Sequence, residues 1–506
     1  MARPDGWVVR YLPALLFLAV YVLTCLLGAL LLLADYRPFV DLFEYFTAVP
    51  TPRLDEGKLA VALFLLIAPP LALVVGFAAA MRLSAGVRDE PERHPTGHAS
   101  ATVPVIVFAA SALLAVVSLV RSGAPANAQA WLSYETWIDA RWHNFQTISF
   151  AEFVNIYLFL PLSAAWVLVT SQGSSRASFV RRWLPTVVAL VLSLLLFQKK
   201  AALVVLLIVI ATWLLDRTRF DVAGLRTKLV GGVGLMAVLY FAMVVIPTFN
   251  AASAIVAASP QRERPALLTP APTVETSPPP GSTRGAESSG RPTGPSTSAR
   301  PTAVPAVTQP PSVAQTSPVV GLALYSLLAP LIRTSVPALY YPVVFPELHG
   351  WYGLDVGQDV ICSPRLGCRN GGMPDDNLVI WDYMNPTFHG GSIAAPFQFA
   401  LYSQVGPVGA LVGALVLGVA VGLGWSLARS GRLAPTWSSM LGALVILLAV
   451  YLAIDSPRNS ILVSYGVVWG LAFLAFGAGL SWAWARIGPG ARRMERGRAR
   501  VAEMAS

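Results

Sequence analysis

LALYSLLAPLIRTSVPALYYPVVFPELHGWYG (residues 322–353) and VICSPRLGCRNGGMPDDNLVIWDYMNPTFHGGSIAAPFQFALYSQVGPVG (residues 360–409) are the stretches around which the rest of the chain is organised. They bring Arg, His, Asp, Trp, Tyr, Gly and Pro together with a close pair of cysteines, whereas long apolar runs make up most of the remaining chain. If the protein carries out chemistry, we expect its surface within this part of the chain, helped by other short loops on the same membrane side.

The composition is that of a protein embedded in a membrane. The 506 residues are 55% hydrophobic and 12% charged, with a mean hydropathy of +0.61. Soluble proteins contain roughly 25% charged residues. We therefore predict an all-α polytopic membrane protein. No cleavable signal peptide is expected, because the first apolar run is long enough to span and lacks a clear cleavage site.

The apolar runs predict about ten transmembrane helices, since a spanning helix needs roughly 20 apolar residues. The fifth and sixth are short, and we interpret them as a hairpin that turns at Lys199 and Lys200, because two lysines in the middle of one long span are costly. The predicted spans are 11–34, 58–80, 102–120, 150–170, 183–198, 201–215, 229–249, 404–427, 437–455 and 461–485.

The formal net charge of +10 follows the positive-inside rule. With both termini in the cytoplasm, the cytoplasmic segments hold 20 basic and 8 acidic residues, and the opposite side holds 16 basic and 18 acidic ones. The excess is thus a topology signal, and the basic tail is expected to contact anionic lipid rather than nucleic acid. This orientation predicts cytoplasmic N- and C-termini and a large extracytoplasmic loop between helices 7 and 8.

The chain divides into five parts by composition. The second of them is rich in Pro, Ser and Thr and contains almost no large apolar residue, so we expect a disordered extracytoplasmic linker. Prolines break the apolar run at its far side, which favours helices that lie at or dip into the outer surface. The parts are an N-terminal bundle of seven helices (1–249), the linker (250–319), the catalytic-type loop (320–403), transmembrane helices 8–10 (404–485) and a basic cytoplasmic tail (486–506).

Cationic side chains supply the clearest candidates for anion binding. Lys199 and Lys200, at the hairpin turn, are suited to hold a diphosphate, although lysines at such a place also extend to lipid headgroups. Arg333 lies in an apolar segment, where an arginine must face a polar cavity or an acidic partner. The other expected substrate-binding residues are Arg141, His143, Arg369 and Arg458.

Acid–base candidates lie in the same loop. His389, next to Gly390 and Gly391, is suited to act as a general base near neutral pH, or to bond to a backbone carbonyl in a tight turn. Asp382 is the carboxylate that we expect to join it, and Asp375-Asp376 is interpreted as a turn. We expect no metal ion and no cofactor, since no carboxylate spacing resembles a cation loop.

Cysteines point to an oxidising compartment. Cys362 and Cys368 enclose a five-residue loop and are expected to form a disulfide on the outer face, with two free thiols as the alternative. Cys25 lies within an apolar run and is expected to be a packed thiol.

Three features resemble the bacterial O-antigen polymerase and oligosaccharide-repeat-unit polymerase group, relatives of the O-antigen ligases. They are the basic hairpin LLLFQKKAALVVLLI (194–208), the late outer loop with Arg333 on its leading apolar part, and the passage HGGSIAAPFQFALYSQVGPVGALVGALVLG (389–418) into a Gly-rich helix. The basic turn here is Lys-Lys instead of the more common Ser-Arg-Gly, and the linker is unusually long.

That resemblance implies a C-type glycosyltransferase fold and a polyprenyl-diphosphate-linked glycan as substrate. By analogy, Lys199, Lys200 and Arg333 hold the departing diphosphate, and His389 or a loop carboxylate takes the proton of the attacking sugar hydroxyl. Membrane lipids and envelope-assembly proteins are the other implied partners, and the process is the synthesis of a cell-envelope or exported polysaccharide.

Other functions are consistent with the same residues. One is a different lipid-linked glycosyltransferase, either a peptidoglycan-type polymerase or a polyprenyl-monophosphate-dependent arabinosyl- or mannosyltransferase. Another is a transporter or flippase of envelope precursors, although such proteins usually show internal repeats and broken helices with polar residues, and we see no repeat. A third is a structural protein of the envelope.

Overall fold

The computed structural model describes fifteen stretches of the chain, and the account below is confined to them. They are residues 6–37, 39–40, 44, 49–84, 102–123, 143, 147–171, 176–196, 199–215, 234, 334–353, 376–384, 394–430, 432–461 and 466–487. Within these stretches the chain is helical and forms no strand.

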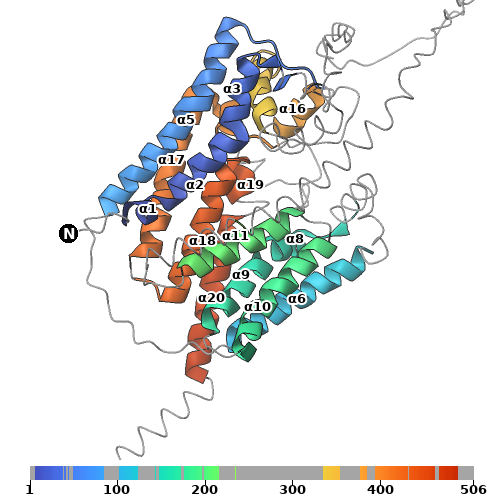
Figure 1. The fold of residues 1–506 in the computed structure, drawn as a ribbon, viewed down its shortest axis with the longest axis vertical. Helices are drawn as coiled ribbons and strands as arrows, with labels where there is room; N and C mark the ends of the chain where they lie inside the picture. The colour runs from blue at the N-terminus through green and yellow to red at the C-terminus, as the bar shows by residue number, and fades with distance from the viewer. Residues whose placement is uncertain are drawn as a thin grey trace, which may run out of the picture.

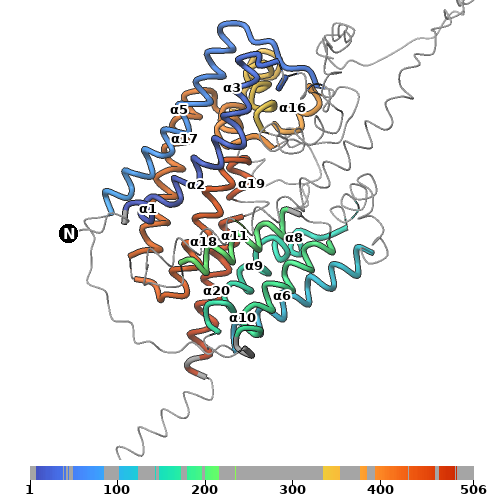
Figure 2. The backbone as a smooth tube through the Cα atoms, viewed as in Figure 1, coloured from blue at the N-terminus to red at the C-terminus, as the bar shows by residue number. Residues whose placement is uncertain are grey.

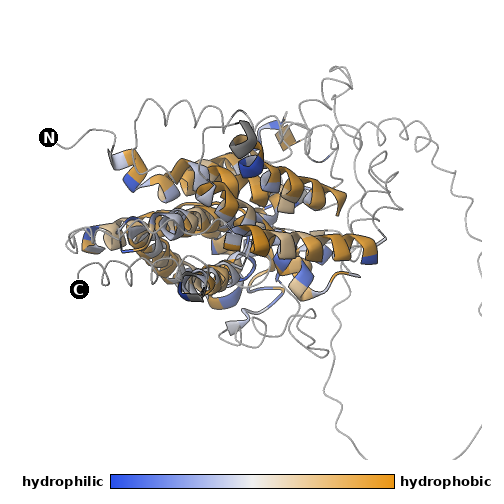
Figure 3. Ribbon diagram, turned by 90° about the horizontal axis from the view of Figure 1, so that it is seen from below, coloured by the Kyte–Doolittle hydropathy of each residue, from blue (hydrophilic) through white to orange (hydrophobic). Residues whose placement is uncertain are grey.

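The chain is a helical, multi-pass membrane protein, as predicted. Seven helices are long and apolar enough to cross a membrane, at Leu12–Leu33, Glu56–Leu83, Thr102–Arg121, Phe150–Thr170, Phe397–Arg429, Pro435–Leu452 and Val467–Trp484. Each of them coincides with a predicted span. Hydrophobic residues dominate the lengths of the helices, and hydrophilic ones gather mainly near their ends (Figure 3).

The remaining three predicted spans have different outcomes. The expected hairpin consists of two separate helices, α10 (Arg176–Leu195) and α11 (Lys199–Leu215), which pack against each other. Neither is among the seven helices above, and α11 is a shorter apolar helix. The span predicted at 229–249 and the linker 250–319 lie outside the described residues.

Two groups of helices build the molecule (Figure 1). The first contains α1 (Gly6–Arg10), α2 (Leu12–Tyr21), the π-helix η1 (Val22–Leu26), α3 (Leu27–Leu33), α5 (Glu56–Leu83), α16 (Asp376–Met384) and α17 (Phe397–Arg429). The second contains α6 (Thr102–Arg121), α8 (Phe150–Val154), the π-helix η4 (Asn155–Phe159), α9 (Leu160–Thr170), α10, α11 and α20 (Val467–Ile487).

Helix α18 (Pro435–Leu452) lies between the two groups (Figure 2). Its residues Ala443, Ile446 and Ala449 belong to the apolar core of the first group. On another face of the same helix, Met440 and Leu444 belong to the core of the second group. A helix that is apolar on every side is suited to this central place, because it has no polar face to keep exposed.

Glycines allow α5 and α17 to pack with their backbones in contact. A Cβ atom built on Gly418 would lie 2.0 Å from the carbonyl oxygen of Leu73, and one on Gly76 would lie 2.3 Å from that of Leu415. Gly422 faces Phe77 and Ala80 in the same way. Since helices approach this closely only where side chains are absent, the small residues of the predicted eighth helix fix its position against α5.

Helix α17 is in fact two helices joined at a sharp break. Gly406 has φ 72° and ψ −173°, outside the helical region, and Pro407 follows it. A Cβ atom on Gly413 would lie 2.8 Å from Leu401 Cδ1, although residues twelve apart in a straight helix are separated by about 18 Å. Residues 397–405 therefore fold back along the segment 407–429. The span that we predicted to begin at 404 begins at 407, and a separate short helix precedes it.

The α5–α17 contact gives a first testable prediction. In Gly418→Ala the added methyl group meets a backbone oxygen that cannot move without shifting α5, so we expect a loss of about 1–3 kcal/mol of stability and a lower melting temperature of the purified protein.

Gly479→Ala is the matched control. Gly479 lies within α20 with open space around its Cα, and alanine has the higher helix propensity, so this variant should be neutral or slightly more stable. Equal melting temperatures of the two variants would contradict the close α5–α17 contact.

Candidate functional site

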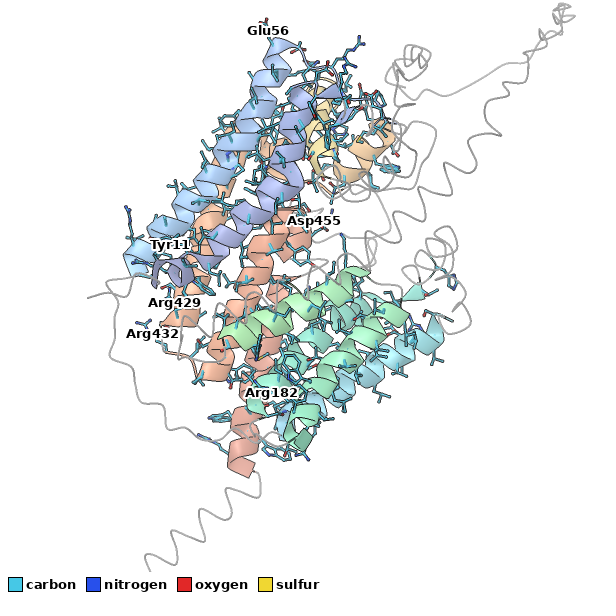
Figure 4. All side chains as sticks on the ribbon, in the orientation of Figure 1. Tyr11, Glu56, Arg182, Arg429, Arg432 and Asp455 are labelled. Atoms are coloured by element: carbon cyan, nitrogen blue, oxygen red, sulfur yellow. The ribbon has the colours of Figure 1, made fainter. Side chains whose placement is uncertain are left out.

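The two ends of the helix bundle are distinguished by residues labelled in Figure 4. We call them the Glu56 end, where α5 begins, and the Arg429 end, where α17 finishes. Pro435, at the start of α18, follows Arg429 after a short connection, so Asp455, just beyond α18, lies at the Glu56 end. The candidate site is assembled at this end from two short helices and two groups of polar side chains.

The first of these is the helical stretch 334–344, whose first described residues lie inside the bundle. Thr334 Oγ1 donates a hydrogen bond to the carbonyl of Thr24, and Ser335 Oγ donates one to the carbonyl of Cys25 at 2.8 Å. Both carbonyls belong to the π-helix η1, where the wider turn disturbs the regular hydrogen-bond ladder. Cys25 is eight residues from the end of α3, which corresponds to about 12 Å along the helix axis.

From there the helix 334–344 runs to the Glu56 end. Tyr340 donates its hydroxyl hydrogen to the carbonyl of Pro50, which precedes α5. Glu347, just past the helix, forms a 2.7 Å ion pair with Lys58 in the first turns of α5. That helices of this part lie at or dip into the outer surface stays a prediction, because residues 320–333 lie outside the described residues.

The second short helix is residues 397–405, and it begins inside the bundle. Gln398 is fully buried, and its Nε2 donates to the hydroxyl of Tyr21 at 3.0 Å. Tyr21 in turn donates to the carbonyl of Leu66 at 2.8 Å. Leu66 is ten residues into α5, about 15 Å from its start. The helix then rises to Gly406, which is covered by the ring of Trp351.

The helix 397–405, whose start at Phe397 is described, therefore points its N-terminal end into the bundle. Helix N-termini carry partial positive charge, and half-length helices with this orientation recur at anion sites of membrane transporters. The predicted span 404–427 did not anticipate the break at Gly406, and the structure corrects it on this point. The missed signals are Pro407, whose missing N–H interrupts the helix, and the Gly406 that precedes it.

A buried carboxylate lies between the two short helices. Asp376, the first residue of α16, is only 5% exposed. Its Oδ2 accepts hydrogen bonds from the Tyr341 hydroxyl and the Ser403 hydroxyl, each at 2.9 Å. Its Oδ1 accepts one from the backbone N–H of Asn377 at 2.9 Å. Three donors of this kind favour the ionised carboxylate.

This arrangement changes the roles that the sequence suggested for the acidic residues of α16. Asp376, which we interpreted as part of a turn, joins the two short helices by hydrogen bonds to Tyr341 and Ser403. Asp382, the predicted catalytic carboxylate, is exposed on the same helix. A residue six positions further along a helix points to a different face, so the two carboxylates do not share one environment.

The second polar group connects α11 to the end of α18. Lys200 Nζ lies 3.8 Å from Oδ2 of Asp455, which is only 4% exposed. The other oxygen of Asp455 accepts hydrogen bonds from the Ser456 N–H at 2.8 Å and from Asn459 Nδ2 at 2.9 Å. Lys200 therefore has a defined acidic neighbour, and the bonds from Ser456 and Asn459 hold that neighbour in place.

Arg458 lies one turn beyond Asp455, within α19 (Pro457–Ile461), and is half-buried. Helix α19 packs against α17 as well as α18. Figure 4 shows Asp455 where the two groups of helices meet. The structure thus brings together Lys200 and the segment that carries Arg458, which are two of the predicted substrate-binding residues.

The other predicted site residues are placed only in part. His143 is exposed, and the side chain of Lys199 is not described, although its backbone begins α11. The residues Arg333, His389, Arg141, Arg369, Cys362 and Cys368 lie outside the described residues. Convergence of the lysines, Arg333 and His389 on one site therefore remains a prediction, as does the disulfide.

Cysteine and metal chemistry add little within the described stretches. Cys25 is a buried free thiol, as expected, and lies among apolar side chains. No group of three or more His, Cys, Asp or Glu residues there is placed to hold a metal ion.

Ionisation outside the spans is shaped by local hydrogen bonds. The backbone N–H of Lys58 donates to Asp55 Oδ1 at 2.8 Å and holds the pKa of this exposed carboxyl below its usual value. Burial raises the pKa of Tyr340, so its hydroxyl stays protonated and can donate to Pro50.

Comparisons with known proteins identify no relative: no family model, no curated protein and no solved structure matches the chain. The function must therefore be argued from the residues themselves.

The Asp376 group gives the second prediction. In Asp376→Asn one carboxylate oxygen is replaced by an NH2 group and the other becomes neutral, so the hydroxyls of Tyr341 and Ser403 both lose their charged acceptor. We expect a loss of about 1–3 kcal/mol of stability, measured as a lower melting temperature in detergent.

Asp382→Asn removes the same charge from the exposed face of the same helix and should shift stability by less than about 0.5 kcal/mol. A melting temperature of Asp376→Asn equal to that of Asp382→Asn would show that the buried carboxylate does not hold the two short helices together.

Proposed function

We propose that the chain is a membrane glycosyltransferase that joins or transfers polyprenyl-diphosphate-linked glycans at the Glu56 end. The observation that carries this proposal is the pair of Lys200 and buried Asp455 at the N-terminus of α11. A cation held near a helix N-terminus is suited to bind phosphate. The resemblance of the basic hairpin and the Gly-rich passage to the O-antigen polymerase group supports the same substrate.

The distance between the Lys200 ammonium and the Asp455 carboxylate is consistent with a lysine that exchanges this carboxylate for a phosphate. At 3.8 Å the Lys200 ammonium and the Asp455 carboxylate attract each other without a short hydrogen bond. In the proposal, a diphosphate takes up ammonium hydrogens of Lys200 while Ser456 and Asn459 continue to hold Asp455. Arg458 supplies further donors from α19, since a guanidinium can bind phosphate with bidentate hydrogen bonds.

The proposed reaction needs little else from the protein. A hydroxyl oxygen of the acceptor glycan attacks the anomeric carbon of the donor, and the bond from that carbon to the diphosphate oxygen breaks. The electron pair of this bond leaves with the polyprenyl diphosphate, whose negative charge Lys199, Lys200, Arg458 and Arg333 stabilise. The hydroxyl proton passes to His389 or to Asp382, the proposed bases.

The charge distribution supports an orientation for this chemistry. Lys200 and Asp455 lie at the Glu56 end, and Arg182, Arg429 and Arg432 lie toward the Arg429 end (Figure 4). By the positive-inside rule, the Arg429 end faces the cytoplasm. The proposed site then opens on the outer face of a bacterial cytoplasmic membrane, where lipid-linked glycans are joined.

A flippase of the same lipid is the second candidate. The observation that favours it is the break at Gly406, which leaves 397–405 as a half-length helix, because such helices surround the binding sites of many transporters. Both candidates share a diphosphate-binding site near Lys200, so the product distinguishes them. A glycosyltransferase lengthens the glycan, whereas a flippase moves an unchanged lipid across the membrane.

The third prediction concerns lipid that co-purifies with the protein. Lys200→Gln removes the proposed phosphate contact, so the amount of polyprenyl-diphosphate-linked glycan bound after purification should fall about 10- to 100-fold. This range corresponds to the 1.5–3 kcal/mol of a hydrogen bond to a charged group. Mass spectrometry of the extracted lipid measures it.

Arg37→Gln is the matched control, since Arg37 is an exposed cation at the same end that pairs with exposed Asp35. The double variant Lys200→Gln with Asp455→Asn tests folding, because it leaves no unpaired carboxylate. Equal lipid retention by Lys200→Gln and Arg37→Gln would overturn the proposed site. A bound monophosphate lipid would instead favour the monophosphate-dependent enzymes.

A further inference from the structure

The Arg429 end carries cations that the proposed function does not use. The described acidic residues, which are Asp35, Glu44, Asp55, Glu56, Glu152, Glu347, Asp376, Asp382 and Asp455, all lie at the Glu56 end. At the Arg429 end the described charged residues are arginines only. Some of them are held in fixed positions by neighbouring helices, which raises the question of what neutralises them.

Arg10 is fixed by two other helices. Its guanidinium Nη2 donates to the carbonyl of Met81, in the last turn of α5, at 3.2 Å. Its own carbonyl accepts a hydrogen bond from the indole N–H of Trp425 in α17 at 3.0 Å. Arg10 thus lies where α1, α5 and α17 meet, and most of its five guanidinium hydrogens remain available.

Arg82 and Arg429 extend from the same junction. Arg82 follows Met81 in α5 and is exposed, and Arg429 lies one turn beyond Trp425 in α17. Neither side chain forms a hydrogen bond or an ion pair in the part of the chain that the structure describes. The Trp425 indole, which donates to the Arg10 carbonyl, places the last turn of α17 and its Arg429 beside Arg10. Repulsion between neighbouring cations favours a bound anion.

The surroundings match a lipid headgroup better than a free anion. Tyr11 lies under the Arg10 guanidinium, 5.7 Å from ring centre to Cζ. The exposed side chain of Trp7 is on the same short helix α1. Tyrosine and tryptophan gather at membrane interfaces. Figure 4 shows Tyr11 and Arg429 near each other at the ends of three spanning helices, where a headgroup and its acyl chains can both be accommodated.

We infer that Arg10, Arg82 and Arg429 bind the phosphate of one anionic phospholipid at the Arg429 end. Basic pockets between transmembrane helices bind headgroups of this class. The acyl chains lie along the apolar outer faces of α5 and α17, where Val75 and Leu423 are exposed. The site is independent of the proposed glycan chemistry, which takes place at the other end.

The fourth prediction tests this site with the full-length protein in nanodiscs of phosphatidylcholine, to which phosphatidylglycerol is added. We expect the wild-type chain to retain phosphatidylglycerol in native mass spectrometry, and its melting temperature to rise with that lipid. Arg429→Gln should reduce the retained phosphatidylglycerol about tenfold, as expected for the loss of one charged hydrogen-bond partner.

Arg181→Gln is the matched control. Arg181 is an exposed arginine of α10 at the same end of the molecule, so its loss changes the net charge equally. Because the Arg429 side chain makes no described bond, its substitution should leave the melting temperature in phosphatidylcholine unchanged.

Three results would overturn the inference. One is equal retention by Arg429→Gln and Arg181→Gln, which would indicate general attraction to an anionic surface. Another is equal stabilisation by inorganic phosphate alone, which would indicate a site for the free anion. The last is the absence of any phosphatidylglycerol effect on the wild-type chain.

Discussion

Every backbone carbonyl inside an apolar bundle needs a hydrogen-bond donor, because lipid offers none. This constraint explains the two contacts that set the depth of the short helices. In a regular helix the Leu66 carbonyl would accept a hydrogen bond from the N–H four residues ahead. That residue is Pro70, which has no N–H, so the hydroxyl of Tyr21 donates instead. The Ser403 carbonyl likewise lacks a donor four residues ahead, because that residue is Pro407. The backbone N–H of Tyr352 donates to it instead. Each proline thus creates an acceptor that ties a distant segment to its helix.

These contacts connect parts of the chain that are far apart in sequence. Tyr21 joins α2 to α5 and, through Gln398, to the start of α17. Gln398 keeps its Oε1 without a donor in the described part of the bundle. A buried amide in this state costs free energy, yet its Nε2 bond fixes the short helix 397–405 at a defined depth. The path of the chain at the Glu56 end is therefore specified by polar atoms rather than by apolar packing alone.

Sequence reasoning was sufficient for the elements whose signal is local. Length and hydropathy predicted ten spans, of which seven coincide with helices long and apolar enough to cross a membrane. Two separate helices, α10 and α11, lie where the hairpin was predicted. It was insufficient where the outcome depends on partners. Nothing near Asp376 in the chain indicates that Tyr341 and Ser403 will donate to it. Asp455 was similarly missed as the neighbour of Lys200. A lysine beside an apolar helix needs an acidic partner or a polar cavity, but the sequence does not say which acidic residue supplies it.

The two ends of the bundle differ in how their helices pack and in how many polar groups they bury. Toward the Arg429 end, Gly76, Gly418 and Gly422 bring α5 and α17 into backbone contact, which leaves no room for a ligand between them. Toward the Glu56 end, α17 is broken at Gly406, and the chain there forms short helices that carry hydroxyl groups and buried carboxylates. Buried polar groups weaken packing unless each is satisfied, so a bundle selected for stability alone would carry apolar side chains there. Tight packing at one end can offset that cost, and this division is the reason to seek the function where the helices are broken.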